Sequence, residues 1–176
     1  VHPWGYPCNM DRIVKIVKKY NLKLIEDCSH SHGAFYDKKK VGSFGDISCF
    51  SLQGNKAIAA GEGGISITDD NIYFFRMSIY GHFNRHQKEM EQLKIFDQFS
   101  NTGISKKLRA HPLGIAMAKV DFDNLVAINK YKLNIYDKID NILQNNKQIK
   151  PIRLNQKSIK GGFFGGYPLI INNLDN

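Results

Sequence analysis

The sequence is poor in several features that define other classes of protein. It has three cysteines without CxxC spacing, five prolines and one tryptophan among 176 residues. No apolar run approaches the roughly 18 residues of a membrane-spanning helix, and there is no low-complexity tract or collagen-like glycine period. An odd number of cysteines cannot close a complete disulfide framework, which favours a reducing, cytoplasmic location. These absences exclude membrane-spanning, fibrous and disulfide-scaffold proteins and leave a globular chain long enough for one domain.

Positive charge is in excess, but only in part of the chain. Basic side chains outnumber acidic ones by 25 to 16, and residues 106–160 hold 12 of the basic and 4 of the acidic ones. The lysines of residues 106–160 are spread among other residues rather than packed into a run. Lysines outnumber arginines by 20 to 5, and the arginine-rich pattern interleaved with aromatics that is typical of proteins binding nucleic acid is absent. The charge therefore favours a solvated surface, and we expect neither a nucleic acid nor a membrane as partner. A non-catalytic, basic polyanion-binding protein is the alternative from another functional class.

The spacing of apolar residues predicts an α/β fold. Asn9 can cap a helix over residues 10–20, in which apolar side chains recur at steps of three and four. A long helix is expected over 112–143, with a break near 121–123. Short apolar runs bounded by glycine and polar residues predict strands at 22–28, 47–52, 64–68 and 167–171.

Polar side chains follow two of the predicted strands. Ligands of open α/β sheets bind at the C-terminal ends of parallel strands. The first strand ends at Glu26 and Asp27 and continues towards His30, while the second ends at Ser51 and leads to Lys56. Glycine and alanine surround Lys56 and leave room for a bulky group. A lone lysine is more often a surface residue, so Lys56 becomes a candidate only through the motifs around it.

Four motifs, in this order and spacing, resemble the central block of the DegT/StrS-type sugar aminotransferases. Their sequences are IEDCSHSHGA (25–34), VGSFGD (41–46), FSLQGNK (50–56) and GEGG (61–64). The resemblance extends over about residues 1–145. It implies a pyridoxal-phosphate (PLP) enzyme of the aspartate aminotransferase type, with the type I fold and a mostly parallel sheet.

The resemblance also implies a division of the chain. Residues 1–124 are expected to form part of the large PLP-binding domain. Residues 125–176 are expected to form the interdomain helix and the beginning of the small C-terminal domain. The chain then represents the central part of a longer protein, inactive alone and active as a homodimer at full length.

Five residues match positions that hold the cofactor in the family. The resemblance implies that Lys56 forms the Schiff base with PLP and then moves a proton between the substrate and the cofactor. Asp27 would pair with the protonated pyridine nitrogen, and Ser51 would bind the phosphate. His30 stands where a glutamine more commonly approaches the phenolic oxygen. Lys107 stands where many relatives have an asparagine that reaches the partner subunit's cofactor phosphate.

Three further residues are candidates for substrate binding, and each has an equally good structural interpretation. His82 and Arg85 are placed to reach the phosphates or sugar of the substrate, or they belong to a solvated turn. Glu62 either contacts the substrate or closes the glycine-rich loop beside Lys56. No metal site is expected.

The reaction implied by the resemblance is transfer of an amino group, from glutamate, to a keto sugar carried by a nucleotide, as in polysaccharide biosynthesis. PLP-dependent sugar dehydratases are an alternative, but they have histidine in place of the catalytic lysine, so Lys56 argues against them. Relatives that act on cyclitols or amino acids are not excluded by these residues.

Overall fold

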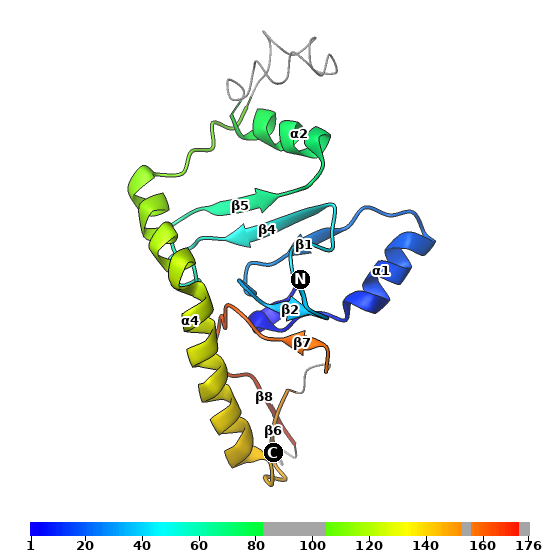
Figure 1. The fold of residues 1–176 in the computed structure, drawn as a ribbon, viewed down its shortest axis with the longest axis vertical. Helices are drawn as coiled ribbons and strands as arrows, with labels where there is room; N and C mark the ends of the chain where they lie inside the picture. Colours follow the sequence, from blue (N-terminus) through cyan, green and yellow to red (C-terminus); the bar gives the residue numbers. More distant parts are fainter. Residues whose placement is uncertain (83–104, 153–155, 173–176) are drawn as a thin grey trace.

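The computed structural model describes residues 1–82, 105–152 and 156–172. Its strands lie beside one long helix, α4, which runs along one side of the molecule (Figure 1). The helices are η1 (Pro3–Gly5), α1 (Met10–Lys19), α2 (Asn71–Gly81) and α4 (Pro112–Leu143). The strands are β1 (Ile25–Asp27), β2 (Phe35–Tyr36), β3 (Lys39–Lys40), β4 (Ile47–Ser51), β5 (Gly64–Ile67), β6 (Ile149–Pro151), β7 (Ser158–Ile159) and β8 (Leu169–Ile171).

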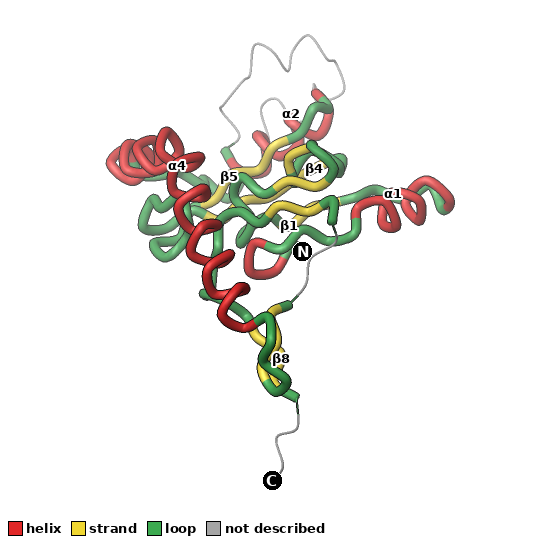
Figure 2. Tube along the Cα trace, turned by 60° about the horizontal axis from the view of Figure 1, so that its bottom comes forward, coloured by secondary structure: helices red, strands yellow, loops and turns green. Residues whose placement is uncertain are grey.

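The sheet that positions the candidate site has the strand order β1-β4-β5 (Figure 2). Strands β1 and β4 are parallel, with Asp27 opposite Cys49, so both strands end at the same edge. Strand β5 is antiparallel to β4, because the chain turns back through a loop without a crossover helix. The expected parallel arrangement therefore holds for the pair that carries the site and not for β5.

Two further pairings bring the C-terminal segment back to the N-terminal part. Strand β7 pairs with β2 in the order β3-β2-β7, and Phe35 lies opposite Ile159. Strands β6 and β8 form a separate antiparallel pair. The β2–β7 pairing places the residues that follow β7 beside the loop that follows β1.

The predicted helices are present. Helix α1 begins after Asn9, whose side chain accepts a hydrogen bond from the backbone N–H of Arg12 at 3.2 Å. Helix α4 begins after His111, with Pro112 at its first position. The break expected near residues 121–123 was wrong, because α4 is one helix of 32 residues. Asp121 instead accepts a hydrogen bond from the backbone N–H of Ala59 at 3.0 Å.

Buried apolar residues form two clusters next to the strands β1 and β4. One cluster joins the loop after β4 to α4 through Leu52, Ile58, Ala118 and Leu125. The other joins β1 to the following loops through Cys28, Ala34 and Val41, with Phe50 packed against it. In the described part of the chain, no helix is long and apolar enough to cross a membrane.

Candidate active site

The sheet brings the first two predicted cofactor ligands to one edge. Asp27 ends β1 and Ser51 ends the parallel neighbour β4. The loops that follow are linked as well, because buried His32 contacts the backbone oxygen of Ser51 through Nε2 at 2.9 Å. The hydroxyl oxygen of Ser51 accepts a hydrogen bond from the backbone N–H of Gln53 at 3.3 Å. Parallel pairing therefore accounts for the proximity of two residues that are 24 positions apart in the sequence.

The surroundings of Asp27 stabilise its ionised form. Its Oδ1 accepts a hydrogen bond from the backbone N–H of Ser29 at 3.0 Å. Interactions with the Ser29 side chain, and then with this N–H, lower the pKa of Asp27 and outweigh the opposing effect of partial burial. Asp27 is therefore ionised at neutral pH, as pairing with a protonated pyridine nitrogen requires.

His30 has a defined hydrogen-bonding role. Its Nδ1 accepts a hydrogen bond from the backbone N–H of Trp4 at 3.3 Å, which leaves the proton of the neutral ring on Nε2. Partial burial, followed by the charge of Lys56, lowers the pKa of His30. The neutral ring therefore presents an N–H donor, as the glutamine more common at this position in the family would.

Lys56 lies in a tight turn at the same edge. Its backbone N–H donates to the backbone oxygen of Gln53 at 2.9 Å, and the loop that follows packs on α4. Gly114 permits this packing, because a Cβ there would lie 2.5 Å from the backbone oxygen of Ala60. The Lys56 side chain is half-buried, and no carboxylate in the described ranges forms an ion pair with it.

One aromatic side chain at the site, Phe164, was not predicted from the sequence. Phe164 stacks on His30, with ring centroids 4.0 Å apart and an angle of 28° between the planes. The Nζ of Lys56 lies 3.3 Å from the centroid of the Phe164 ring. The sequence feature that could have pointed to Phe164 is a pair of phenylalanines between two glycine pairs. This feature does not indicate which strand the segment approaches in the folded chain.

The segment before Phe164 is held by close backbone packing. Asn129, buried on α4, donates to the backbone oxygen of His32 at 2.9 Å and accepts from the backbone N–H of Gly162 at 3.1 Å. A Cβ on Gly161 would lie 2.3 Å from the backbone nitrogen of Ala34. Only glycine fits at this contact, so the two loops lie directly against each other and Phe164 is fixed beside His30.

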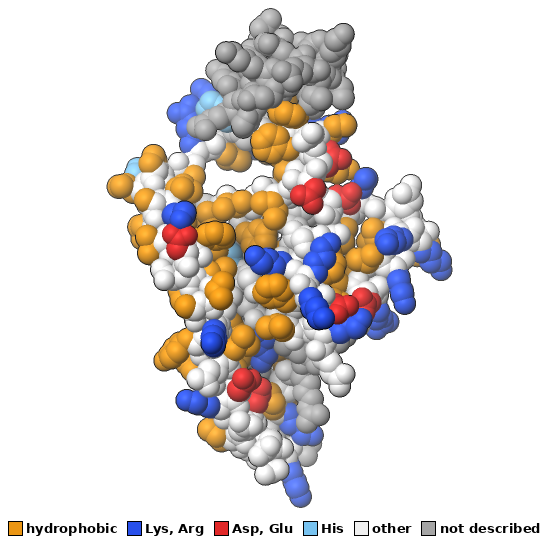
Figure 3. Space-filling model, in the orientation of Figure 1, with side chains coloured by type: hydrophobic (Ala, Val, Ile, Leu, Met, Phe, Trp, Pro, Cys, Tyr) orange, Lys and Arg blue, Asp and Glu red, His pale blue; other side chains and the backbone are white. Residues whose placement is uncertain are grey.

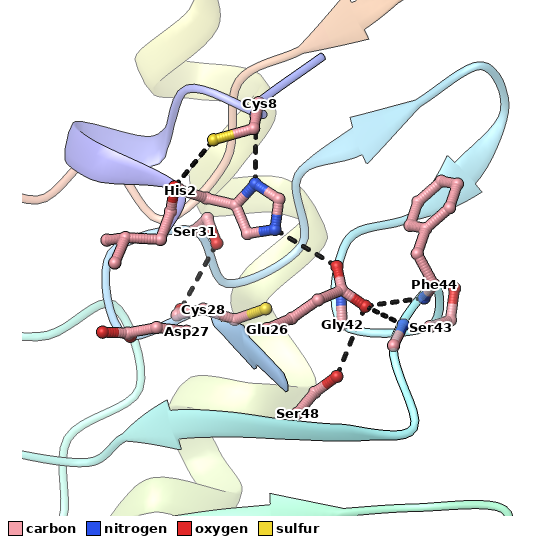
Figure 4. A network of polar contacts seen from close by, with 12 residues as sticks. His2, Cys8, Glu26, Asp27, Cys28, Ser31, Gly42, Ser43, Phe44 and Ser48 are labelled. Carbon is pink, nitrogen blue, oxygen red and sulfur yellow. Dashed lines mark hydrogen bonds and ion pairs between the residues drawn. The ribbon is translucent and has the colours of Figure 1, made fainter. Parts of the chain in front are cut away.

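Glu26, next to Asp27, is the centre of a buried hydrogen-bond network (Figure 4). Its carboxylate accepts from the backbone N–H groups of Phe44 at 2.6 Å, Gly45 at 2.7 Å and Gly42 at 2.8 Å. His2 contacts the same carboxylate through Nε2 at 3.1 Å. Burial alone would raise the pKa of Glu26, but these hydrogen bonds outweigh it and lower the pKa. Glu26 therefore ties the loop after β3 to β1, behind the site.

Part of this network also has the composition of a metal site. His2, Glu26 and Cys28 each offer one possible ligand atom, and these atoms lie within 4.8 Å of one another. However, His2 Nδ1 accepts from the backbone N–H of Cys8 at 3.0 Å, so the neutral ring uses Nε2 to donate to Glu26. Burial, followed by the charge of Glu26, raises the pKa of Cys28 to about 12, so this thiol stays protonated. His2 and Glu26 are therefore hydrogen-bonded to each other, and Cys28 lies beside them as a protonated thiol.

Glu62, His82 and Lys107 form no hydrogen bond or ion pair with Lys56 in the described part of the chain. Glu62 is exposed in the loop before β5. His82 ends α2 and lines a cavity of about 420 Å³, and within the described residues its buried Nδ1 has no hydrogen-bond partner. Lys107 is exposed, with the neighbouring Leu108 N–H bonded to the backbone oxygen of Gly81 at 2.7 Å. Arg85 lies outside the described residues. The roles of these four residues stay predictions.

The basic side chains form no continuous patch on the face shown in Figure 3. Lysine and arginine are spread over the side that carries α1 and over the lower end, with acidic side chains between them. This distribution agrees with the solvated surface expected from the sequence.

Comparison with known proteins agrees with the family resemblance found in the sequence. A sequence model described as the DegT/DnrJ/EryC1/StrS aminotransferase family matches residues 1–174. The chain is 35% identical over 156 residues to GDP-perosamine synthase of Escherichia coli O157:H7, covering 86% of this chain and 41% of that protein. It is 38% identical over 128 residues to dTDP-3-amino-3,6-dideoxy-alpha-D-galactopyranose transaminase of Aneurinibacillus thermoaerophilus, covering 70% of this chain and 33% of that protein.

Solved structures support the fold. The crystal structure of the aminotransferase TlmJ from Streptoalloteichus hindustanus superimposes with a TM-score of 0.80 at 16% identity, covering 97% of this chain and 44% of that one. The similarity at this identity concerns the fold, which is the expected type I fold. In these three comparisons the chain spans between about a third and less than half of the length of the other protein.

Proposed function

Because the chain belongs to the DegT/DnrJ/EryC1/StrS aminotransferase family, we propose that the whole protein is a PLP-dependent aminotransferase acting on a keto sugar carried by a nucleotide. The observation that carries this proposal is that Asp27 ends the strand beside β4 and that His30 and Lys56, from the loops that follow these two strands, both contact Phe164. Two relatives bear the names of a perosamine synthase and a dTDP-sugar transaminase, which supports this class of substrate. We propose glutamate as the amino donor from the family resemblance.

The residues at this edge fit PLP by the chemistry of their polar groups. Asp27 is an anion that suits the protonated pyridine nitrogen, and His30 offers an N–H donor that suits the phenolic oxygen. The hydroxyl of Ser51 suits the phosphate. When bound, PLP supplies an electron-poor ring that delocalises the negative charge left after a proton leaves the substrate carbon.

Lys56 is the proposed catalytic residue. Its primary amine has no carboxylate partner in the part of the chain that the structure describes. As a neutral amine, Lys56 is a nucleophile towards the cofactor aldehyde. When it is not bonded to the cofactor, the same amine is a base that can take the proton from the substrate carbon. Its tight turn on α4 holds the amine at the strand ends where Asp27 and His30 lie.

We further propose that the whole protein is a cytoplasmic homodimer, divided near residues 124 and 125 into the large domain and the beginning of the small one. All three cysteines are free, which supports a reducing compartment. Large apolar side chains are exposed along α4, which supports a protein surface that covers them. They include Leu113, Met117, Val120, Phe122 and Val126. In such a dimer, Lys107 would reach the partner subunit's cofactor phosphate.

The proposal is tested by a transfer assay on the protein expressed from its complete reading frame. With PLP and glutamate, we expect amino transfer to at least one member of a panel of nucleotide-linked keto sugars. Keto-cyclitols and amino acids belong in the panel, because the sequence does not exclude them. PLP-dependent transfer to a cyclitol alone would retain the family and correct the substrate, whereas no transfer to any acceptor would contradict the proposed activity.

Asp27→Asn should weaken both cofactor retention and turnover. Asparagine keeps an Oδ1 acceptor for the Ser29 N–H but removes the charge proposed to pair with the pyridine nitrogen. A hydrogen bond to a charged group contributes about 1.5–3 kcal/mol, so we expect activity to fall roughly 10- to 100-fold. The measurement compares kcat and PLP affinity of the two proteins. If Asp27→Asn kept both values, the role proposed for Asp27 would be wrong.

A further inference from the structure

Phe164 is the aromatic side chain that covers the amine of Lys56. The Nζ of Lys56 lies 3.3 Å from the centroid of the Phe164 ring. The same ring also stacks on His30, with the two centroids 4.0 Å apart. The described ranges contain no carboxylate that pairs with Lys56. Among the described residues, the face of Phe164 is therefore the contact that the amine of Lys56 makes.

The position of the Phe164 ring is set by the three residues that precede it. Gly162 is held by Asn129, and Gly161 donates its N–H to the backbone oxygen of Gly5 at 3.2 Å. Phe163 is buried and packs edge-on against Tyr136, with centroids 4.9 Å apart. These contacts anchor all three residues, so the Phe164 ring lies against Lys56 on a fixed backbone.

A cation over an aromatic face is attracted by the ring quadrupole, whereas a neutral amine is not. The form of lysine that reacts with an aldehyde is the neutral amine. A ring placed over the amine therefore stabilises the unreactive form and at the same time fixes the side chain in one position. Leucine at position 164 would keep most of the side-chain volume but would have no aromatic ring. Tyrosine would keep the aromatic face.

We propose that Phe164 is a positioning residue that holds the Lys56 amine at the site through the face of its ring and restrains its reactivity towards aldehydes. The importance of this for catalysis rests on the function proposed above, in which Lys56 reacts with the aldehyde of PLP. The contact itself does not depend on that function. Phe164 thus couples the segment after α4 to the residue proposed to do the chemistry.

The test measures acetylation of Lys56 by acetic anhydride in the protein expressed from its complete reading frame and freed of PLP. Mass spectrometry quantifies the label on Lys56 relative to Lys138, an exposed lysine of α4. Near neutral pH, we expect Phe164→Leu to raise the relative rate roughly fivefold, and Phe164→Tyr to stay within about twofold of the native protein. Above about pH 11, where lysine is mostly neutral, the native and Leu rates should converge.

Three results would overturn the proposal. Equal rates in the native and Leu proteins at neutral pH would show that the ring does not restrain the amine. A Leu rate raised equally at both pH values would show that the ring only blocks access. A Tyr rate as high as the Leu rate would show that the aromatic face is not what restrains the amine. Failure of PLP to form a borohydride-trapped adduct at Lys56 of the native protein would instead contradict the proposed function, whatever the acetylation result.

Discussion

Replacement of Lys56 by alanine is expected to reduce amino transfer by about 10³-fold or more. In the proposed reaction, Lys56 supplies both the nucleophile that holds the cofactor and the base that moves the substrate proton. General base catalysis alone contributes about 10²–10⁴-fold. The half-buried side chain makes no ion pair within the described part of the chain, so its removal should leave the fold intact. The measurement is kcat with glutamate and the best keto sugar.

Arginine at position 56 is the matched control for charge. Lys56→Arg keeps a cation that can lie over Phe164, but the guanidinium does not lose its proton in proteins and cannot serve as the nucleophile. We therefore expect Lys56→Arg to be as inactive as Lys56→Ala. Lys138→Ala, which changes an exposed lysine of α4, should keep native activity. Substantial activity in Lys56→Arg would mean that the residue acts only through its charge.

Glu26→Gln is expected to lower the free energy of unfolding by about 2–4 kcal/mol. The native carboxylate accepts from three backbone N–H groups and contacts His2, and a glutamine keeps only one oxygen for these donors. A buried donor left without an acceptor costs about 1–3 kcal/mol. Such a loss is large against the usual total stability of about 5–15 kcal/mol. Urea unfolding measures it.

Replacement of an exposed glutamate by glutamine is the control. Glu62→Gln should change the free energy of unfolding by less than about 0.5 kcal/mol, because Glu62 is exposed and has no hydrogen bond or ion pair among the described residues. A comparable loss in both variants would mean that the Glu26 network does not carry the stability assigned to it.

The effect of Glu26→Gln should depend on pH. The folded state lowers the pKa of Glu26 below its ordinary value of 4.5, because the hydrogen bonds to the carboxylate outweigh its burial. A lowered carboxyl pKa contributes stability that is complete above the unfolded pKa and is lost as the pH falls through the folded one. The difference between native and Glu26→Gln proteins should therefore be full at neutral pH and shrink progressively below about pH 4.5. A difference that stays constant to low pH would exclude the ionised carboxylate as its cause.

Local patterns in the sequence were sufficient for two of the helices and for the strands that lead to the candidate site, whereas the roles of the site residues came from the family resemblance. The apolar spacing predicted α1 and α4, and the runs before Asp27 and Lys56 predicted β1 and β4. These predictions depend on neighbours three or four residues apart or on a single strand, so no long-range contact has to be known. The break expected in α4 was wrong because Asp121 and Asp123 resemble a polar interruption. In the folded chain Asp121 instead accepts a hydrogen bond from the Lys56 loop.

Residues whose roles depend on distant pairing could not be found in this way. Phe164 reaches His30 only because β7 pairs with β2 and Asn129 holds the segment between them. Glu26 was noted only as part of a polar strand end. Its role depends on three N–H groups of the loop after β3, which turn towards it only after folding. Apolar period and motif spacing contain no information about either contact.

The central claim is that Lys56 is the lysine that binds the cofactor. It is tested most directly by adding PLP to the protein expressed from its complete reading frame, reducing with borohydride, digesting, and locating the modified lysine by mass spectrometry. We predict about one PLP adduct per chain, on Lys56, and none at that position after Lys56→Arg. An adduct confined to other lysines, or no adduct at all, would contradict the assignment.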